Sequence, residues 1–190
     1  TSMGGVLTGT LAAIWIFLVT YCGYDRAPGE WLSDRWLSRT AGAAALAVAL
    51  LPIGREGYPV CIGEPRTCWV FGATAHADLL HYAAAFVFFL CLALLSLVQF
   101  PRGERDASGR LRWTGRTFTF LLSGTAILAM MAAILPYFLA DPETMVLLQE
   151  NRYRFWCESI AVLAFATSWL ANGGALGTLV RAMGRMGGGA

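Results

Sequence analysis

The sequence contains no lysine, because all 14 of its basic residues are arginine. A retinal Schiff base and a pyridoxal phosphate aldimine each form on a lysine amine, and a Walker-type phosphate loop also uses one. Rhodopsin-like photochemistry, pyridoxal phosphate catalysis and lysine-dependent phosphate binding are therefore excluded. The net charge of +2 is also too small to favour a nucleic-acid partner.

Charged residues are scarce, at 14% of the chain, whereas 57% of the residues are hydrophobic. Soluble proteins carry about a quarter charged residues. Five stretches of low charge are each near the length that crosses about 30 Å of hydrocarbon as a helix. The sequence predicts an all-α, polytopic transmembrane helix bundle that forms one domain, residues 1–182, followed by a flexible glycine-rich tail, 183–190. The five predicted spans are residues 4–23, 36–54, 74–100, 117–140 and 155–180.

The second predicted span contains Ala41, Ala45 and Ala49 at helical spacing. A stripe of small residues allows two helix backbones to approach closely, so we expect this helix to lie inside the bundle. The alternative is that alanine is present only because it forms helices well.

The arginines are distributed unevenly among the connectors. Five of them lie between Pro101 and Arg116. Positively charged connectors stay on the cytoplasmic side of a membrane. Placing this connector inside puts ten arginines inside and four outside, which predicts an external N-terminus and an internal C-terminus. We expect the inner membrane of a bacterium, with six spans instead of five if another helix precedes residue 1.

Two of the five cysteines, Cys61 and Cys68, share the external connector between the second and third predicted spans. Disulfides persist in oxidising compartments such as the bacterial periplasm. The sequence predicts a Cys61–Cys68 disulfide that closes a short loop, with two free thiols as the alternative.

Ionisable residues gather near the predicted outer ends of two spans. Asp78 and His81 are three residues apart, so they share one face of a helix, and Glu158 lies about one turn into the fifth span. We expect these three side chains to meet in one layer, with Arg152 or Arg154 as counter-ion. The cluster is either a hydrogen-bonded staple between helices or a divalent-metal site.

The first connector contains Asp25, Arg26, Trp31 and Trp36. Its acidic and basic residues balance, and tryptophan favours the headgroup region of a membrane. We expect an amphipathic stretch lying at the interface, with a surface for docking a partner as the alternative.

A resemblance to a known group of proteins is carried by stretches spread over most of the chain. These stretches are Gly23–Asp25, Arg39–Gly42, Val48–Pro52, His81–Phe89 with Ser96, Phe155–Glu158 and Ser168–Leu170. Together they resemble uncharacterised bacterial integral-membrane proteins distantly similar to the FRAG/DRAM-type families. The resemblance implies that Asp25, His81 and Glu158 occupy marked positions of the pattern, and it favours six helices.

The sequence shows no converging set of nucleophile, base and oxyanion donors. We therefore expect a non-enzymatic multi-pass membrane protein, either a small subunit of a larger membrane assembly or homo-oligomer, or a lipid-binding bundle. The alternative is a metal-assisted hydrolase that acts on outer-leaflet lipids through Asp78, His81 and Glu158. A proton or ion pathway is a weaker third hypothesis, because the ionisable groups lie in the outer half of the spans and the middle offers little beyond Ser96, Ser123 and Thr125.

Overall fold

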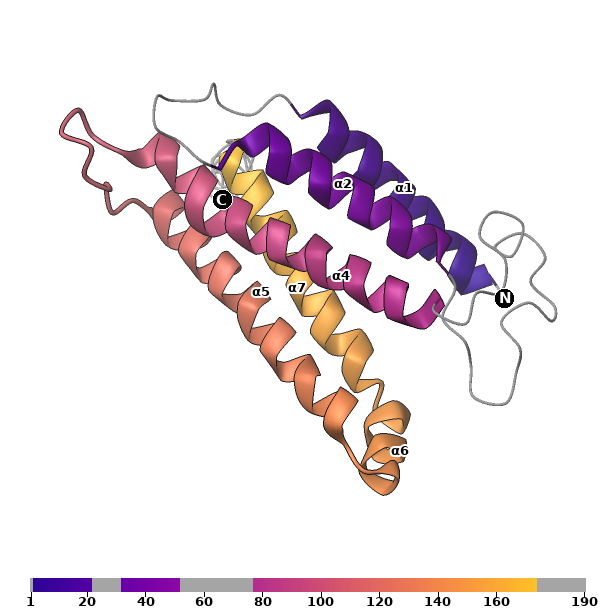
Figure 1. The fold of residues 1–190 in the computed structure, drawn as a ribbon. Coiled ribbons are helices and arrows are strands. Elements are labelled where there is room, and N and C mark those ends of the chain that lie inside the picture. The colour runs from indigo at the N-terminus through magenta and orange to yellow at the C-terminus, as the bar shows by residue number, and fades with distance from the viewer. Residues whose placement is uncertain (1, 22–31, 52–76, 174–190) are drawn as a thin grey trace, which may run out of the picture. The chain divides into compact units, whose positions relative to one another are not determined.

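A computed structural model describes residues 2–21, 32–51 and 77–173 (Figure 1). These residues form helices and contain no β-strand, only one isolated bridge between Arg105 and Leu111. The all-α prediction is thereby confirmed. The chain divides into two compact units, residues 1–91 and 92–190, and each is described by itself.

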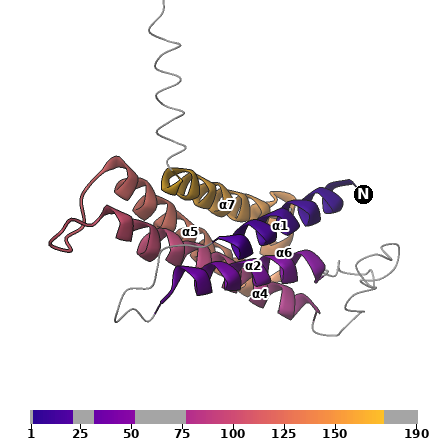
Figure 2. The ribbon, with the colours of Figure 1, turned by 90° about the horizontal axis from the view of Figure 1, so that it is seen from above.

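The first unit holds α1 (Ser2–Thr20), α2 (Asp34–Leu50) and most of α4 (Ala77–Leu94). Figures 1 and 2 both draw α1 and α2 side by side. Ala41, Ala45 and Ala49 are all buried, so the small-residue stripe lies on a packed face of α2. The place of α2 inside a larger bundle stays a prediction.

Two further small residues of α2 explain how closely it approaches α1. The hydroxyl of Ser38 donates a hydrogen bond to the carbonyl of Leu18. A Cβ atom at Gly42 would come within 2.9 Å of the Val19 side chain and 3.3 Å of the Trp15 carbonyl oxygen. Glycine at residue 42 therefore permits backbone contact between the two helices.

The second unit begins inside α4, whose last residues continue as a π-helical segment, Leu95–Gln99, and a 3-10 turn, Phe100–Glu104. Proline lacks the N–H that a regular helix needs, and Pro101 lies where the winding changes. The N–H of Phe100 donates to the carbonyl of Leu95, which is the five-residue bond of a π-turn. The unit then contains α5 (Gly115–Leu139), α6 (Pro142–Glu150) and α7 (Tyr153–Asn172).

Aromatic rings fill the contact between the 3-10 turn, α5 and α7. The ring centroid of Phe100 lies 5.6 Å from that of Phe120 and 5.6 Å from that of Trp169, and Trp169 lies 5.5 Å from Phe165. Phe100 and Phe120 are fully buried. Offset and edge-on ring pairs at these distances favour packing beyond the area they bury.

Helix α6 lies where the sequence predicts only a connector. Asp141 is its N-cap and accepts hydrogen bonds from the backbone N–H groups of Glu143 and Thr144, at 3.1 and 3.0 Å. Arg152, between α6 and α7, has a φ of 51°, which is left-handed backbone. The hydroxyl of Tyr153 then donates to the carbonyl of Ala133 in α5, at 2.9 Å.

Two helical stretches are long and apolar enough to cross a membrane: Leu79–Glu104, of 26 residues, and α5, of 25 residues. Among the residues whose side chains the structure describes, the part of α1 from Gly9 to Thr20 is apolar but shorter. Helix α2 has 17 residues, which gives a length of about 26 Å at 1.5 Å per residue. The prediction of five spans stays a prediction, and residues 174–190, with the end of the fifth span and the tail, lie outside the described residues.

Candidate functional site

His81 lies near the start of α4 and contacts the end of α2. Its Nδ1 atom is 2.9 Å from the carbonyl oxygen of Leu51. Because a carbonyl only accepts, Nδ1 carries the proton in this contact. His81 therefore links α4 to the C-terminal end of α2, while Asp78 belongs to α4 but its side chain lies outside the described part of the structure.

Glu158 forms an ion pair one helical turn back along α7. Its carboxylate is 3.7 Å from Nε of Arg154. Cζ of the same guanidinium group lies 5.7 Å from the centre of the Tyr137 ring on α5. Arg154 is therefore the counter-ion, one of the two arginines that the sequence suggests. The Arg154 and Glu158 side chains are 30% and 45% exposed.

The three residues of the predicted acid–histidine cluster are divided between the two units. His81 and Asp78 belong to the first unit and Glu158 to the second. Their meeting in one layer stays a prediction. Among the side chains that the structure describes, no group of three His, Cys, Asp or Glu residues is arranged to hold a metal ion.

Of the residues predicted to lie at the membrane interface, the structure describes only Trp36. Trp36 lies in the first turn of α2, and its side chain is largely exposed. The other residues of the interfacial and disulfide predictions lie outside the described residues: Asp25, Arg26, Trp31, Cys61 and Cys68.

The structure assembles a polar network at the opposite end of the second unit, which the sequence analysis missed. We call Glu104, Thr114, Arg116 and Thr117 the Glu104 network. Nη1 of Arg116 is 2.9 Å from Oε1 of Glu104. The hydroxyl of Thr114 donates to the other carboxylate oxygen at 3.0 Å. The Glu104 side chain is only 11% exposed. Both of its carboxylate oxygens therefore have a partner within the protein, where water has little access.

Arg116 also binds the end of α7. Its Nε donates to the carbonyl of Ala171 at 3.2 Å, and its Nη2 donates to the carbonyl of Asn172 at 3.1 Å. The last carbonyls of a helix have no partner within the helix and carry a partial negative charge. One guanidinium group therefore joins the 3-10 turn, the start of α5 and the end of α7.

Thr114 and Thr117 fix the start of α5. Thr114 is the N-cap, and its hydroxyl oxygen accepts from the backbone N–H of Thr117 at 3.2 Å. Thr117 is buried, and its hydroxyl donates to the carbonyl of Arg112 at 2.7 Å. Threonine before an uncharged run is an N-cap signal that the sequence already contains. The pairing of Glu104 with Arg116 depends on the fold of the segment between them.

That segment is a hairpin held by one carboxylate. Oδ1 of Asp106 accepts from the hydroxyl of Ser108 at 2.6 Å and from the backbone N–H of Arg110 at 2.9 Å. The Ser108 hydroxyl bond is the main reason that the pKa of Asp106 lies below its ordinary value, and the Arg110 bond adds to it. Gly109 has a φ of 80°, which glycine adopts without steric cost.

The groups of the Glu104 network are occupied in joining three elements, because the Thr114 hydroxyl and the Arg116 guanidinium both bind the Glu104 carboxylate. Its chemical effect is to neutralise one carboxylate and to hold the hairpin. Comparison of the chain with protein-family models, with curated proteins and with solved structures finds no match.

Proposed function

We propose that the chain is a non-enzymatic multi-pass membrane protein that acts as a lipid-binding bundle or as a small subunit of a larger membrane assembly. The observation that carries this proposal is the exposure of α5. This helix is apolar along 25 residues, yet only 22% of its most apolar 18-residue window is buried. A core helix of a soluble protein is mostly buried within its own chain. The exposed apolar side chains of α5 therefore need lipid or another apolar partner around them.

The length and charge pattern of α5 match a bilayer. Its 25 residues extend about 37 Å, enough for about 30 Å of hydrocarbon with some tilt. Between Arg116 and Asp141 the sequence contains no charged residue. The exposed side chains along the helix are large and apolar, among them Phe118, Leu122, Leu128, Leu135 and Leu139.

Helix α7 likewise has one buried face, and its exposed side chains are large and apolar. The residues buried in the unit are small or aromatic, namely Cys157, Ala161, Phe165, Ser168 and Ala171. The exposed large side chains are again apolar, including Phe155, Trp156, Ile160, Leu163 and Leu170. Helices α5 and α7 therefore pack through one face and present apolar surface on the others, which is the pattern of helices in lipid.

The wider topology belongs to the same proposal. Five spans are proposed from the five stretches of low charge, and the external N-terminus from the uneven distribution of arginines. The inner membrane of a bacterium is part of the same proposal. The non-enzymatic assignment is supported by the polar side chains at the ends of α5 and α7. Glu104 and Arg116 satisfy each other at one end, and Arg154 pairs with Glu158 at the other.

The proposal is tested by labelling two cysteine variants in intact membranes with a membrane-impermeant maleimide. Leu128 lies in the middle of α5 and is 40% exposed, so Leu128→Cys would react if water surrounded the helix. Ala107→Cys lies at the hairpin, where the side chain is exposed, and provides the matched accessible site. Peptide mass spectrometry reads each site separately from the native cysteines.

We expect Ala107→Cys to be labelled once the membrane is made permeable to the maleimide, and Leu128→Cys to stay unlabelled until detergent dissolves the membrane. The chain should also stay in the membrane fraction after alkaline extraction. Rapid labelling of Leu128→Cys without detergent would contradict the proposal. Native mass spectrometry in mild detergent then separates the two forms of the function, because retained lipids indicate a lipid-binding bundle and a second chain in fixed ratio indicates a subunit.

A further inference from the structure

We propose that the hairpin between Arg102 and Arg116, here called the basic hairpin, binds the headgroups of anionic phospholipids, with Trp113 inserted at the boundary between headgroups and acyl chains. The inference rests on the proposed function, because it places the start of α5 at the surface of a bilayer. It adds the chemical class of the lipid and the residues that select it.

The positive charge of the protein is concentrated in this hairpin. Residues 102–116 contain five arginines against Glu104 and Asp106, which leaves +3, whereas the whole chain carries +2. The rest of the chain is therefore slightly acidic. A guanidinium group matches the geometry of a phosphate and is always charged, so arginine is suited to a phospholipid headgroup.

Three of the five arginines are engaged within the protein. Arg116 pairs with Glu104 at 2.9 Å, Arg102 donates to the side chain of Gln99 at 2.7 Å, and Arg105 donates to the carbonyl of Gly109 at 3.0 Å. The Arg102 bond holds the hairpin to the helical segment before it, Arg116 joins it to the start of α5, and the Arg105 bond closes the hairpin on itself.

Arg110 and Arg112 are the two that remain. Both are exposed, and their guanidinium groups make no hydrogen bond or ion pair with a residue of the described segments. Arg112 is near enough to Asp106 to lower the pKa of that carboxyl slightly. Two guanidinium groups are therefore available to an outside anion.

The backbone that carries these two arginines is already ordered. Arg105 and Leu111 form an antiparallel bridge, and Asp106 holds the turn through Ser108 and the backbone of Arg110. The N–H of Arg112 donates to the carbonyl of Glu104 at 2.9 Å. Binding therefore does not require the loop to be ordered first, which favours affinity.

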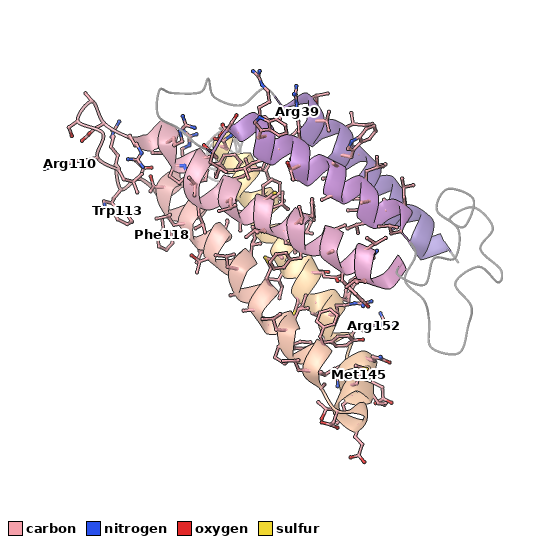
Figure 3. All side chains as sticks on the ribbon, viewed as in Figure 1. Arg39, Arg110, Trp113, Phe118, Met145 and Arg152 are labelled. Atoms are coloured by element: carbon pink, nitrogen blue, oxygen red, sulfur yellow. The ribbon has the colours of Figure 1, made fainter. Side chains whose placement is uncertain are left out.

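The neighbouring side chain identifies a membrane surface as the partner. Trp113 is 78% exposed, the most exposed aromatic side chain that the structure describes. Figure 3 shows Arg110 and Trp113 at the hairpin and Phe118 at the start of α5. Tryptophan favours the interface of a bilayer, where its apolar ring and its N–H are both accommodated.

The order of residues along the chain matches the order of layers in a membrane. Four of the five arginines come first and Trp113 follows them. Arg116, which is paired with Glu104, comes next, and the uncharged run of α5 begins directly after it. A nucleic acid would meet the arginines but would leave the exposed rings of Trp113 and Phe118 in water. An anionic lipid accounts for the charged and the apolar parts of the patch together.

The test uses the full chain reconstituted in bilayers of phosphatidylcholine with a small, equal fraction of brominated phosphatidylglycerol or brominated phosphatidylcholine. Bromine quenches tryptophan fluorescence on contact. The protein has seven tryptophans, so the Trp113 signal is taken as the difference between the full chain and the Trp113→Phe variant. We expect anionic lipid to be enriched beside Trp113 by roughly fivefold, and the enrichment to fall as salt is added.

The double variant Arg110→Gln and Arg112→Gln should abolish the preference of Trp113 for the anionic quencher. The matched control is Arg35→Gln with Arg39→Gln, which removes two exposed arginines from α2 and should leave the Trp113 signal unchanged. Both variants alter exposed side chains, and an unchanged melting temperature verifies that they fold.

Equal quenching of Trp113 by the two brominated lipids would overturn the inference. So would an absence of Trp113 quenching while the other six tryptophans are quenched, and in that case the membrane proposal survives. If no tryptophan is quenched by either lipid, the proposed function fails together with the inference. The two failures are therefore distinguishable in one experiment.

Discussion

The two ends of the α5–α7 pair are fastened differently. At the first end, which we call the Arg116 end, a carboxylate that is only 11% exposed meets Arg116, and fully buried rings pack beside it. At the second, the Arg152 end, the contacts are more open. Arg154 and Glu158 are 3.7 Å apart and partly exposed, and the side chain of Gln149 donates to the Tyr137 hydroxyl at 3.3 Å on the surface.

The difference shows that a polar contact must be weighed by its burial. Exposed ion pairs contribute about 0 to 1 kcal/mol, because water and salt screen them and the side chains lose entropy. A shielded carboxylate that loses its partner costs more, since its desolvation is no longer compensated. We infer that the pair is held mainly at the Arg116 end and opens more easily at the Arg152 end.

The largest expected effect comes from Arg116→Gln. It removes the charge that faces Glu104 and weakens the cap on the last carbonyls of α7, so the free energy of unfolding should fall by about 2 to 3 kcal/mol. The matched control at the other end is Arg154→Gln, which should cost at most about 1 kcal/mol. Thermal unfolding in detergent compares the two. Similar losses would show that the ends do not differ.

A second test of the Arg116 end is Gly124→Ala in the same half of α5. A Cβ atom there would lie 2.7 Å from Cδ2 of Leu97 and 3.2 Å from Cβ of Ser96. Overpacking of this kind should cost about 1.5 kcal/mol. Gly115→Ala is the control, because a Cβ atom at residue 115 meets nothing within 4 Å. If the two variants unfold at the same temperature, the close packing of α5 against Leu97 is not a source of stability.

At the Arg152 end, the turn before α7 carries backbone strain. Arg152 has a φ of 51°, and a residue with a side chain pays about 1 kcal/mol for left-handed backbone. Arg152→Gly should therefore be more stable than Arg152→Ala by about 1 kcal/mol, since both variants lose the same charge and differ in backbone freedom. The measurement is again the unfolding midpoint. Equal midpoints would show that the turn is not strained.

Much of the helical framework follows from the sequence. The long apolar runs predict α5 and the extended α4, and alanine spacing predicts the buried face of α2. Helix α6 could also have been found, because Asp141 followed by Pro142 is a start signal for a helix. It was missed because a stretch rich in charge between two spans resembles a connector.

The candidate site was harder to predict. Histidine and acid on one helix face indicate a site at Asp78 and His81, whereas the network forms between Glu104 and Arg116, twelve residues apart. That contact exists because the hairpin between them closes through Asp106 and Gly109, and because the end of α7 arrives at the same place. Neither condition is a local property of the chain. The predicted layer of Asp78, His81 and Glu158 stays a prediction.

The smallest expected effect is a pH dependence confined to the Arg116 end. The pKa of Asp106 is held below its ordinary value, mainly by the hydroxyl of Ser108. Because the folded pKa is lower than the unfolded one, the carboxylate stabilises the hairpin above the ordinary aspartate pKa of about 3.9. That stability is lost as the pH falls through the lowered value. The amide of Arg110, which donates to Asp106, should then lose its protection from hydrogen exchange.

The variant Asp106→Asn isolates the titration from the turn itself. An asparagine oxygen can accept the same bonds from Ser108 and Arg110, but it does not ionise in this range. In the variant, the protection of the Arg110 amide should be lower at neutral pH and should not change as the pH is lowered. In the native chain, that protection should be lost on acidification. Parallel pH profiles for the two proteins would show that the carboxylate charge does not hold the hairpin. The arginines that we assign to lipid would then be positioned by the backbone bonds of the turn alone.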